Sequence, residues 1–585
     1  MSLLPPGFRP EVPAARPGHV GKGSMLRRMI LWIAVVVPAV TMGGSPARAQ
    51  DPIGQQIAAM SLAEKVGQMV VAYVYGADAD TVTEADAAAN RAMFGADVST
   101  GAQAVAKHHL GGIIYFTWSR NLATPPQIAA LSNGLQRAAM ADTGIPLQIS
   151  TDQEGGVVNR IGAPLAVSPG NMAIGATFDP RTAYAAAKVS GTELKALGIN
   201  VVHAPVVDVN TNPRNTADGV RAFGDRTVPV AAFGVAAVRG YRAAGIGTQA
   251  KHFPGLGDTT VNTDNGVAVT DESRAQIMAT HVPPFRAAIA AGTQTIMAAH
   301  IVAPSLDPSG RPASLSRPII TGLLRDQLHF RGVVITDALE AAALSDYSNE
   351  QIVLDAVNAG VDQLLMPRNV PGAIAALTGA VRAGTISERR IDESVRRILK
   401  TKTYAPYVPA QPVVGTPEHL TTMAGIAARS ITTLRNAALP LRPEQKVLVT
   451  GWGVSTTTNL ANALGATRFY TGSPSDAVIA QAVAAAQAAD VTVVTTYNAW
   501  GDVTQQRLVA ALLATGRPIV VAAVGGPYDI AYFPQATTYV CAYGYQPVST
   551  TALAAVLTGR ATAPGRLPVT VDGLFPYGSG LSERR

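Results

Sequence analysis

Charged side chains and histidines recur directly or shortly after short apolar runs between residues 150 and 340 of this sequence. In chain order they are Asp152 and Glu154, Asp208, Lys251 and His252, His300, and Asp337. An ionised carboxylate such as Asp337 can act as a nucleophile when neighbouring lysine or arginine side chains favour its charged form. Taken singly, Asp208 also fits a helix N-cap and His300 a buried structural histidine. Their repeated position after apolar runs indicates a shared catalytic site.

The apolar runs that precede these residues predict eight buried strands. They lie at residues 68–73, 112–116, 146–150, 200–204, 247–251, 295–299, 332–336 and 361–366, with alanine-rich stretches of helical spacing between them. Continuous apolar runs are typical of parallel strands that are buried on both faces. The alternation predicts a (β/α)8 TIM-type barrel over residues 50–402, with a doubly wound sheet as the alternative. In such a barrel the residues that follow the strands gather at one face, where catalytic side chains lie.

After residue 402 the sequence changes character. Residues 403–445 combine a proline-rich linker with a connecting helix, which Thr416 caps and which we expect to run to about Leu434. Further strands are predicted at 446–450, 491–495, 518–522 and 538–542, with a helix at 476–489. Residues 446–585 are therefore predicted to form a C-terminal α/β sandwich domain.

Residues 1–49 have the order of a leader with a secretory signal peptide. Arg27-Arg28 precedes an apolar run at residues 29–42, and the small-residue pattern Ala47-Arg-Ala49 follows. A membrane anchor is the alternative, but a helix that spans a bilayer needs about 20 apolar residues and this run is shorter. We therefore expect cleavage after residue 49, no stable membrane anchor afterwards, and a secreted, periplasmic or cell-wall-associated bacterial protein.

Composition and motif content exclude several functional classes. The net charge is +7, but six basic residues and one acidic residue lie in residues 1–49. The remaining chain is nearly neutral and lacks the electrostatic footprint of a nucleic-acid-binding protein. Gly451-Trp-Gly453 lacks the third glycine of a nucleotide fingerprint, and Lys107-His-His109 has no carboxylate at metal-ligand spacing. We therefore expect no cofactor and no metal, and the single cysteine, Cys541, is expected to fill the core.

Carboxylates at the mouth of a barrel without a cofactor motif suit glycoside hydrolysis, which needs an ionised nucleophile and a protonated acid. Five segments carry a more specific signal. They are Ser150-Thr-Asp-Gln-Glu-Gly-Gly156, Lys251-His-Phe-Pro-Gly255 and Gly332-Val-Val-Ile-Thr-Asp-Ala-Leu339, with Arg221-Ala-Phe223 and Ala313-Ser-Leu-Ser316 in support. In this order they resemble glycoside hydrolase family 3, and more closely its branch of bacterial β-N-acetylglucosaminidases (β-N-acetylhexosaminidases). The resemblance runs from about residue 55 to 400, and more loosely into the second domain.

The resemblance implies a role for each matching residue. Asp337 would be the nucleophile, which attacks the anomeric carbon and forms a glycosyl-enzyme. The sugar would be bound by Asp152, Arg160, Arg221, Lys251 and His252. Physical chemistry agrees, since cationic neighbours keep a nucleophilic carboxylate ionised and planar donors bind hydroxyl groups.

One segment departs from the family pattern. The N-acetylglucosaminidase branch has a histidine after Lys-His-Phe-Pro-Gly and then an Asp-Ser-His triplet, whose histidine is the general acid/base. In this sequence Leu256 replaces the first histidine, and residues 262–264 (Asn-Thr-Asp) replace the triplet. Asp264, with Asp258 as an alternative, is the expected acid if burial raises its pKa; a turn residue is the other interpretation of Asp264. The acid can also come from the second domain, where Asp502 is a candidate.

Three hypotheses for function follow. The first is a secreted, exo-acting, retaining glycosidase that removes terminal β-N-acetylglucosamine from peptidoglycan fragments or chitin-type oligosaccharides. The second is the same fold acting on β-glucosides or β-xylosides, or using phosphate in place of a protein acid. The third is a glycan-binding protein that has lost hydrolysis, which the retained Asp337 argues against. The sequence alone does not determine the oligomeric state.

Overall fold

Eight parallel strands close into a barrel in the computed structural model, which describes residues 51–581. They are β1 (Val70–Ala72), β2 (Gly112–Ile114), β3 (Gln148–Thr151), β6 (Val201–Val202), β7 (Gly247–Phe253), β8 (Thr295–Ala298), β9 (Val333–Thr336) and β10 (Leu364–Leu365). Their order is β10-β1-β2-β3-β6-β7-β8-β9, and a bridge between Ile335 and Gln363 joins β9 to the residue before β10. Each strand overlaps one predicted run, so the barrel prediction is confirmed. The predicted signal peptide, residues 1–49, lies outside the described residues.

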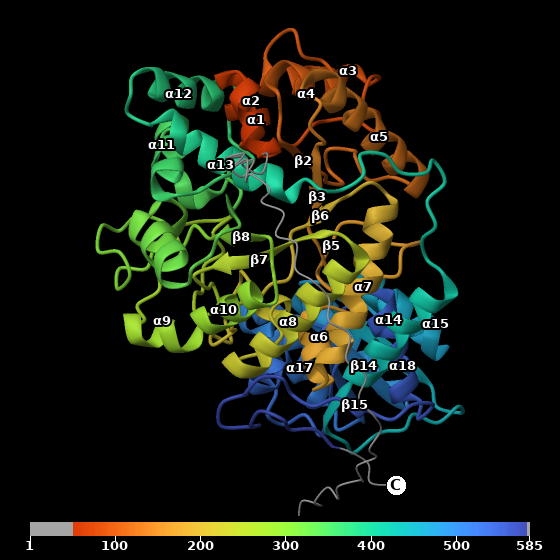
Figure 1. Cartoon of the computed structure of the whole chain (residues 1–585). Helices are drawn as coiled ribbons and strands as arrows, with labels where there is room; N and C mark the ends of the chain where they lie inside the picture. Colours follow the sequence, from red (N-terminus) through yellow and green to blue (C-terminus); the bar gives the residue numbers. More distant parts are fainter. Residues whose placement is uncertain (1–50, 582–585) are drawn as a thin grey trace, which may run out of the picture. The chain divides into compact units, whose positions relative to one another are not determined.

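Helices connect these strands and lie outside them, as Figure 1 shows for α4, α5, α11 and α12. In chain order they are α1 (Pro52–Ala59), α2 (Leu62–Gln68), α3 (Glu84–Phe94), α4 (Gly101–His108), α5 (Pro125–Asp142), α6 (Asn171–Ala176), α7 (Pro180–Ala196), α8 (Thr227–Ala244), α9 (Arg274–Thr280), α10 (Val282–Ala290), the π-helical segment Pro318–Gln327, α11 (Asn349–Ala359), α12 (Val370–Arg382) and α13 (Glu388–Thr401). Local sequence sets their starts: the Thr124 hydroxyl accepts a hydrogen bond from the Gln127 N–H, and prolines follow it in the first turn of α5.

A second sheet of six strands forms the C-terminal domain. Its strands are β11 (Thr432–Arg435), β12 (Val447–Gly451), β13 (Thr467–Tyr470), β14 (Val491–Thr496), β15 (Ile519–Ala523) and β16 (Thr538–Cys541), in the order β11-β16-β15-β14-β12-β13. Its helices are α14 (Pro417–Ser430), α15 (Val454–Leu464), α16 (Asp476–Gln487), α17 (Val503–Leu513) and α18 (Pro547–Leu557). Val449 and Val493 pack in one core with α15 and α18, whereas Leu448 and Val494 pack in another with α16 and α17. Helices therefore cover both faces, which confirms the predicted α/β sandwich.

Two features of this domain differ from the prediction. The connecting helix ends at Ser430 and not near Leu434, because residues 432–435 form β11 and pair antiparallel with β16. β13 was missed because its residues are mostly exposed at the edge of the sheet and do not form an apolar run. A strand of the C-terminal sheet thus lies inside the segment that the sequence assigned to the linker, and the exact domain boundaries stay predictions.

The barrel and the sandwich belong to one compact unit that begins at Pro52. Gln546 Nε2 of the sandwich donates a hydrogen bond to the Gly156 carbonyl of the barrel at 3.0 Å. The backbone N–H of Thr570 donates to the Asp225 carboxylate at 2.7 Å, and Asn210 Nδ2 donates to the Tyr528 hydroxyl at 3.1 Å. These contacts join the sandwich to loops of the barrel.

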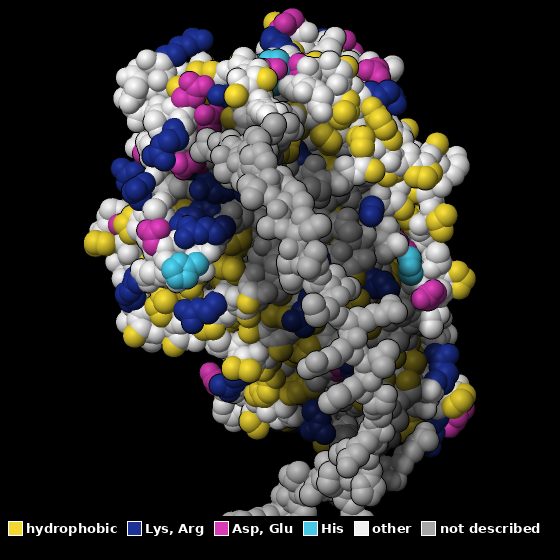
Figure 2. All heavy atoms as spheres, in the orientation of Figure 1, with side chains coloured by type: hydrophobic (Ala, Val, Ile, Leu, Met, Phe, Trp, Pro, Cys, Tyr) yellow, Lys and Arg dark blue, Asp and Glu magenta, His cyan; other side chains and the backbone are white. Residues whose placement is uncertain are grey.

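The described surface carries mixed charge. On the face drawn in Figure 2, lysine and arginine side chains are dispersed among acidic and uncharged ones and form no continuous basic stripe. Within residues 51–581, no helix combines the length and apolar character that a membrane span requires.

Asp362, two residues before β10, is a buried charge whose removal should destabilise the protein. Its carboxylate is paired with Arg325 and with Arg397 at 3.0 Å, and it accepts hydrogen bonds from Ser394 Oγ at 2.7 Å and the Val334 N–H at 2.9 Å. Asp362→Ala leaves the buried Arg325 guanidinium without its counter-charge, so we expect a loss of ~3–5 kcal/mol in the free energy of unfolding.

Urea or thermal denaturation followed by circular dichroism measures this loss. Asp97→Ala is the matched control, because the Asp97–Lys107 pair is exposed and its removal should leave the unfolding midpoint unchanged. A midpoint for Asp362→Ala equal to that of the control would contradict the prediction.

Candidate active site

A cavity of about 460 Å³ lies at the carboxyl ends of the barrel strands. Its lining includes all seven residues that the sequence analysis assigned to the site. They are Asp152, Arg160, Arg221, Lys251, His252, Asp264 and Asp337. Asp152 follows β3, Lys251 and His252 end β7, and Asp337 follows β9, so the barrel brings these residues together from distant parts of the sequence.

A chain of buried ion pairs occupies one side of the cavity. Lys251 Nζ lies 2.7 Å from Asp152 Oδ1 and 2.7 Å from Glu154 Oε1, and Arg221 contacts both Glu154 oxygens at 2.8 Å. Burial opposes ionisation of Asp152, but the Lys251 ammonium holds the pKa of this carboxyl well below its ordinary value. Burial likewise opposes ionisation of Glu154, but Arg221 and Lys251 lower its pKa to about 2. All four side chains are therefore charged, with Glu154 at the centre.

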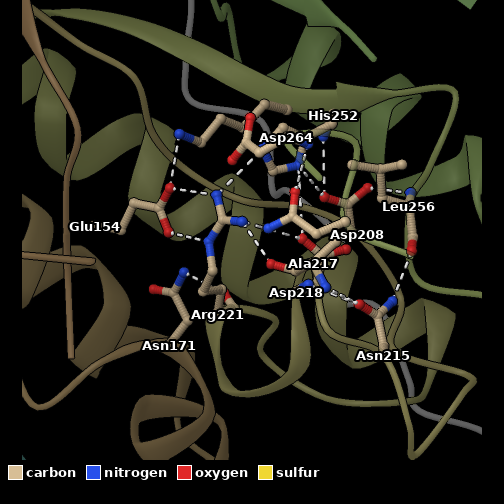
Figure 3. A network of polar contacts seen from close by, with 12 residues as sticks. Glu154, Asn171, Asp208, Asn215, Ala217, Asp218, Arg221, His252, Leu256 and Asp264 are labelled. Atoms are coloured by element: carbon tan, nitrogen blue, oxygen red, sulfur yellow. Dashed lines mark hydrogen bonds and ion pairs between the residues drawn. The ribbon is translucent and has the colours of Figure 1, made fainter. Parts of the chain in front are cut away.

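His252 is oriented by a carboxylate behind it. Asp208 Oδ2 lies 2.8 Å from His252 Nδ1 and accepts the backbone N–H of His252 at 3.0 Å, while Asp208 Oδ1 accepts the Leu256 N–H at 2.9 Å. Arg221 Nη2 lies 3.2 Å from His252 Nε2, and Figure 3 shows Arg221 between Glu154 and His252. Burial lowers the pKa of His252, but the Asp208 carboxylate more than offsets this and raises it. The interpretation of Asp208 as a helix cap is wrong, since its side chain holds His252.

Asp337 has the environment of an ionised carboxylate. Its Oδ1 accepts the Ala338 N–H at 2.8 Å, and its own N–H donates to the Ala298 carbonyl at 2.9 Å. Burial raises the pKa of Asp337, but His252 and His300, the Ala338 N–H and Lys251 outweigh it, so the pKa lies below its ordinary value. A carboxylate that stays ionised in the lining of the cavity is suited to nucleophilic attack.

His300 contacts the backbone of Ala338, the residue after Asp337. Its Nε2 donates to the Ala338 carbonyl at 3.0 Å, and its Nδ1 lies 2.7 Å from Ser314 Oγ in the 3-10 turn Ala313–Leu315. Burial lowers the pKa of His300 below its ordinary value. The structural interpretation of His300 is confirmed, and it also explains why Ala313-Ser-Leu-Ser316 accompanies the site.

Asp264 lies at the tip of the loop that follows β7. The Asn262 side chain accepts the Asp264 N–H at 2.9 Å, which is the Asx-type turn that the sequence allowed, and the Asp264 carbonyl accepts the Ala342 N–H. The Asp264 carboxyl is exposed to the cavity, yet the surrounding protein atoms and the negative charge of Asp337 raise its pKa above its ordinary value. Asp264 therefore forms part of a turn through its backbone and also has a side chain with a raised pKa.

The two other acid candidates lie outside the lining of this cavity. Asp258 Oδ2 accepts a hydrogen bond from Thr270 Oγ1 at 3.0 Å. Asp502 is the N-cap of α17, where it accepts the Gln505 N–H at 3.0 Å and the Thr504 hydroxyl at 2.7 Å. Asp264 is therefore the acid candidate that faces Asp337.

Asp208, Asp218 and His252 form the one group of potential metal ligands in the described part of the chain, with ligand atoms within 4.8 Å of one another. Asp208 and His252 bond each other. Among the described residues the two Asp218 oxygens accept no hydrogen bond, but one of them lies 3.9 Å from the Arg221 guanidinium and 3.6 Å from His252 Nδ1, so cationic groups already lie beside it. Burial and the charge of Asp208 raise the pKa of Asp218 to about 7, so this carboxyl is readily neutral. The donor set fits a positioning network better than a divalent cation.

Sequence reasoning assigned no role to several lining residues. Glu154 was noted with Asp152 in the same motif, but its role depends on Arg221, 67 residues away. Phe116 and Trp118, whose rings stack at 4.8 Å, and Tyr497 and Tyr545 of the sandwich also line the cavity. Nothing local marks these aromatic residues as parts of a site.

Comparisons with known proteins agree with this geometry. Residues 61–401 match the family model described as the glycosyl hydrolase family 3 N-terminal domain, and residues 431–573 match that of the C-terminal domain. The chain is 33% identical to beta-hexosaminidase A of Pseudoalteromonas piscicida, over 80% of this chain and 90% of that protein. It is 30% identical to a beta-N-acetylglucosaminidase/beta-glucosidase of Cellulomonas fimi, over 79% and 88%. A solved family 3 beta-N-acetylglucosaminidase from Paenibacillus sp. superimposes with a TM-score of 0.80 at 36% identity, over 88% and 99%.

Proposed function

The chain belongs to glycosyl hydrolase family 3, and from this premise we propose that it is an exo-acting, retaining β-N-acetylglucosaminidase with Asp337 as nucleophile. The observation that carries the proposal is the pairing in one cavity of Asp337, whose pKa is lowered, with Asp264, whose pKa is raised. When the environment lowers the pKa of one carboxyl group and raises the pKa of another in the same site, the first is suited to act as nucleophile and the second as acid. Two similar proteins are named as β-N-acetylglucosaminidases, which supports N-acetylglucosamine as the sugar that this chain removes.

The reaction proceeds in two steps. In the first, an Asp337 oxygen attacks the anomeric carbon while the Asp264 carboxyl donates its proton to the departing glycosidic oxygen, leaving a glycosyl ester on Asp337. In the second, the Asp264 carboxylate takes a proton from water, which attacks the same carbon and releases the sugar. Both steps invert the anomeric centre, so the overall configuration is retained.

Barrel residues supply the groups that hold the sugar. Asp152 offers a carboxylate oxygen to hydroxyl donors, while Arg221, Lys251 and His252 offer cationic or imidazole groups beside it. Arg160 reaches over the Phe116 ring, 5.7 Å from its centroid, and adds a guanidinium at the rim. Ion pairs link Asp152, Lys251 and Arg221 through Glu154, so these side chains are already oriented before substrate arrives, which lowers the entropy cost of binding.

Terminal β-N-acetylglucosamine of cell-wall or chitin-type oligosaccharides is the proposed substrate. The predicted secretory signal at residues 1–49 supports export to a compartment where such glycans occur. A second candidate is β-glucosidase activity, which the combined name of the Cellulomonas fimi relative favours.

The test compares aryl N-acetyl-β-glucosaminide, aryl β-glucoside and aryl β-xyloside with the purified protein, with and without inorganic phosphate. We expect kcat/KM for the N-acetyl sugar to exceed the others by at least about tenfold, with a β-anomeric first product by NMR. Preference for the glucoside supports the second candidate, and a sugar phosphate as product indicates phosphorolysis. No turnover of any substrate, together with glycan binding, would identify a binding protein.

A further inference from the structure

Three aromatic side chains of the sandwich form a cluster beside the cavity. Trp452 follows β12, Tyr497 follows β14 and Tyr545 lies beyond β16. Trp452 and Tyr497 are stacked with ring centroids 4.3 Å apart at an interplanar angle of 16°, and Tyr545 lies 5.3 Å from Trp452 and 5.9 Å from Tyr497. All three are partly exposed, so the cluster is not simply part of the core.

Tyr497 and Tyr545 line the same cavity as Asp337, although they come from the other domain. The residue after Tyr545 connects the two domains, because Gln546 Nε2 donates to the Gly156 carbonyl at 3.0 Å. Gly156 lies in the turn between β4 (Gln153–Gly155) and β5 (Val158–Asn159), which directly follows Asp152. The aromatic cluster is therefore tied to the loop that carries the sugar-binding carboxylates.

The position of Tyr497 is fixed by its neighbours. Both its backbone groups bond the Gln505 side chain, with Tyr497 N–H donating to Oε1 at 2.8 Å and the Tyr497 carbonyl accepting from Nε2 at 3.1 Å. A Cβ at Gly525 would lie 2.8 Å from the Tyr497 ring, so glycine leaves the space in which the ring sits. Burial and Tyr545 raise the pKa of Tyr497 to about 12, which keeps the phenol neutral.

We propose that Tyr497 and Tyr545, backed by Trp452, form the binding site for the leaving-group sugar, an uncharged pyranose ring. This inference rests on the proposed function, in which the barrel holds the terminal sugar. The charged and hydrogen-bonding groups that suit that sugar all come from the barrel, whereas the sandwich contributes to the described cavity lining only these two tyrosines. Rigid aromatic faces bind the apolar faces of a ring at low conformational cost, and a surface without charge favours an uncharged ring.

The test measures kcat/KM of Tyr497→Ala and Tyr545→Ala on two substrates. One is the disaccharide N,N′-diacetylchitobiose, whose leaving group is a sugar, and the other is methyl N-acetyl-β-glucosaminide, whose leaving group has no ring. We expect kcat/KM for the disaccharide to fall by about 10- to 100-fold in each variant, with values for the methyl glycoside within twofold of the unmodified protein. Tyr497→Phe should retain activity on both, because it keeps the ring.

Tyr470→Ala is the matched control, since Tyr470 is an exposed tyrosine of the same domain on edge strand β13 and does not line the cavity. Equal losses on both substrates would mean that the rings contact the terminal sugar, and unchanged values would mean that they contact no sugar; either result overturns the proposal. If the unmodified protein cleaves neither substrate, the proposed function fails first and this inference fails with it.

Discussion

Asp337→Asn is expected to lower kcat/KM on aryl N-acetyl-β-glucosaminides by about 10⁴-fold or more, the largest loss for any single substitution in this protein. The amide has nearly the shape of the carboxylate but no nucleophilic oxygen, so the glycosyl ester cannot form. Its surroundings are arranged for a negative charge: the Ala338 N–H donates to Oδ1 at 2.8 Å, and His252 and Lys251 lower the pKa of Asp337. Steady-state kinetics with a chromogenic substrate measures the loss.

A matched control separates chemistry from folding. Asp346 is an exposed aspartate that follows the 3-10 turn Ala342–Leu344, and Asp346→Asn should leave kcat/KM unchanged. In addition, azide should restore turnover to Asp337→Ala and yield a glycosyl azide of α configuration, because a small anion can attack the open face. Residual activity of Asp337→Asn within tenfold of the unmodified protein would assign the nucleophile to another residue.

Asp264→Asn is expected to lower kcat by about 10²- to 10⁴-fold on a substrate with a poor leaving group, such as a methyl or sugar glycoside. A dinitrophenyl leaving group needs no proton, so formation of the glycosyl ester from it should be almost unaffected. Asp264 lines the cavity together with Asp337, and burial and the negative charge of Asp337 raise its pKa, which favours the protonated form that donates a proton. The ratio of the two losses distinguishes an acid from a merely structural turn residue.

The same assignment predicts the pH dependence. Asp337 must be ionised and its pKa is lowered, so activity is lost only as the pH falls through that low value. Asp264 must be protonated and its pKa is raised, so activity is lost as the pH rises through that value. The profile of kcat/KM is therefore a bell, with an acidic limb set by Asp337 and an alkaline limb set by Asp264, and Asp264→Asn should remove the alkaline limb.

Asp258→Asn is the control for the acid, because Asp258 belongs to the same loop but bonds Thr270 outside the cavity lining. It should change neither the leaving-group dependence nor the alkaline limb. If Asp258→Asn produces these effects, or if Asp264→Asn slows both kinds of substrate equally, Asp264 is not the acid.

Much of the site could be predicted from local sequence. Most barrel strands are short apolar runs, although β3 and β7 also contain polar residues. Lys251-His252 lies at the carboxyl end of β7, and Asp337 directly follows β9. In a parallel barrel that position alone determines on which face a side chain lies. The helices were predictable for a similar reason, since caps such as Thr124 act within one turn.

Partners that lie far apart in sequence could not be predicted in this way. Asp208 looked like a helix cap, yet it bonds His252, which is 44 residues further along. The strand β11 looked like the end of a helix, because its pairing with β16 involves residues more than a hundred positions away. A local pattern contains no information about which distant group will satisfy a buried charge or a free strand edge.

Short motifs and hydrophobic periodicity were enough to predict the barrel, the sandwich, the family and the residues that surround the proposed nucleophile. The three-dimensional fold was needed to show that Glu154 links Arg221 to Lys251, and that Asp264 faces the cavity whereas Asp258 and Asp502 do not. It also decided that two tyrosines of the sandwich reach the cavity of the barrel, across the contact between Gln546 and Gly156, 390 residues apart. These features arise from packing between elements that the chain order separates, and packing is set by the whole fold.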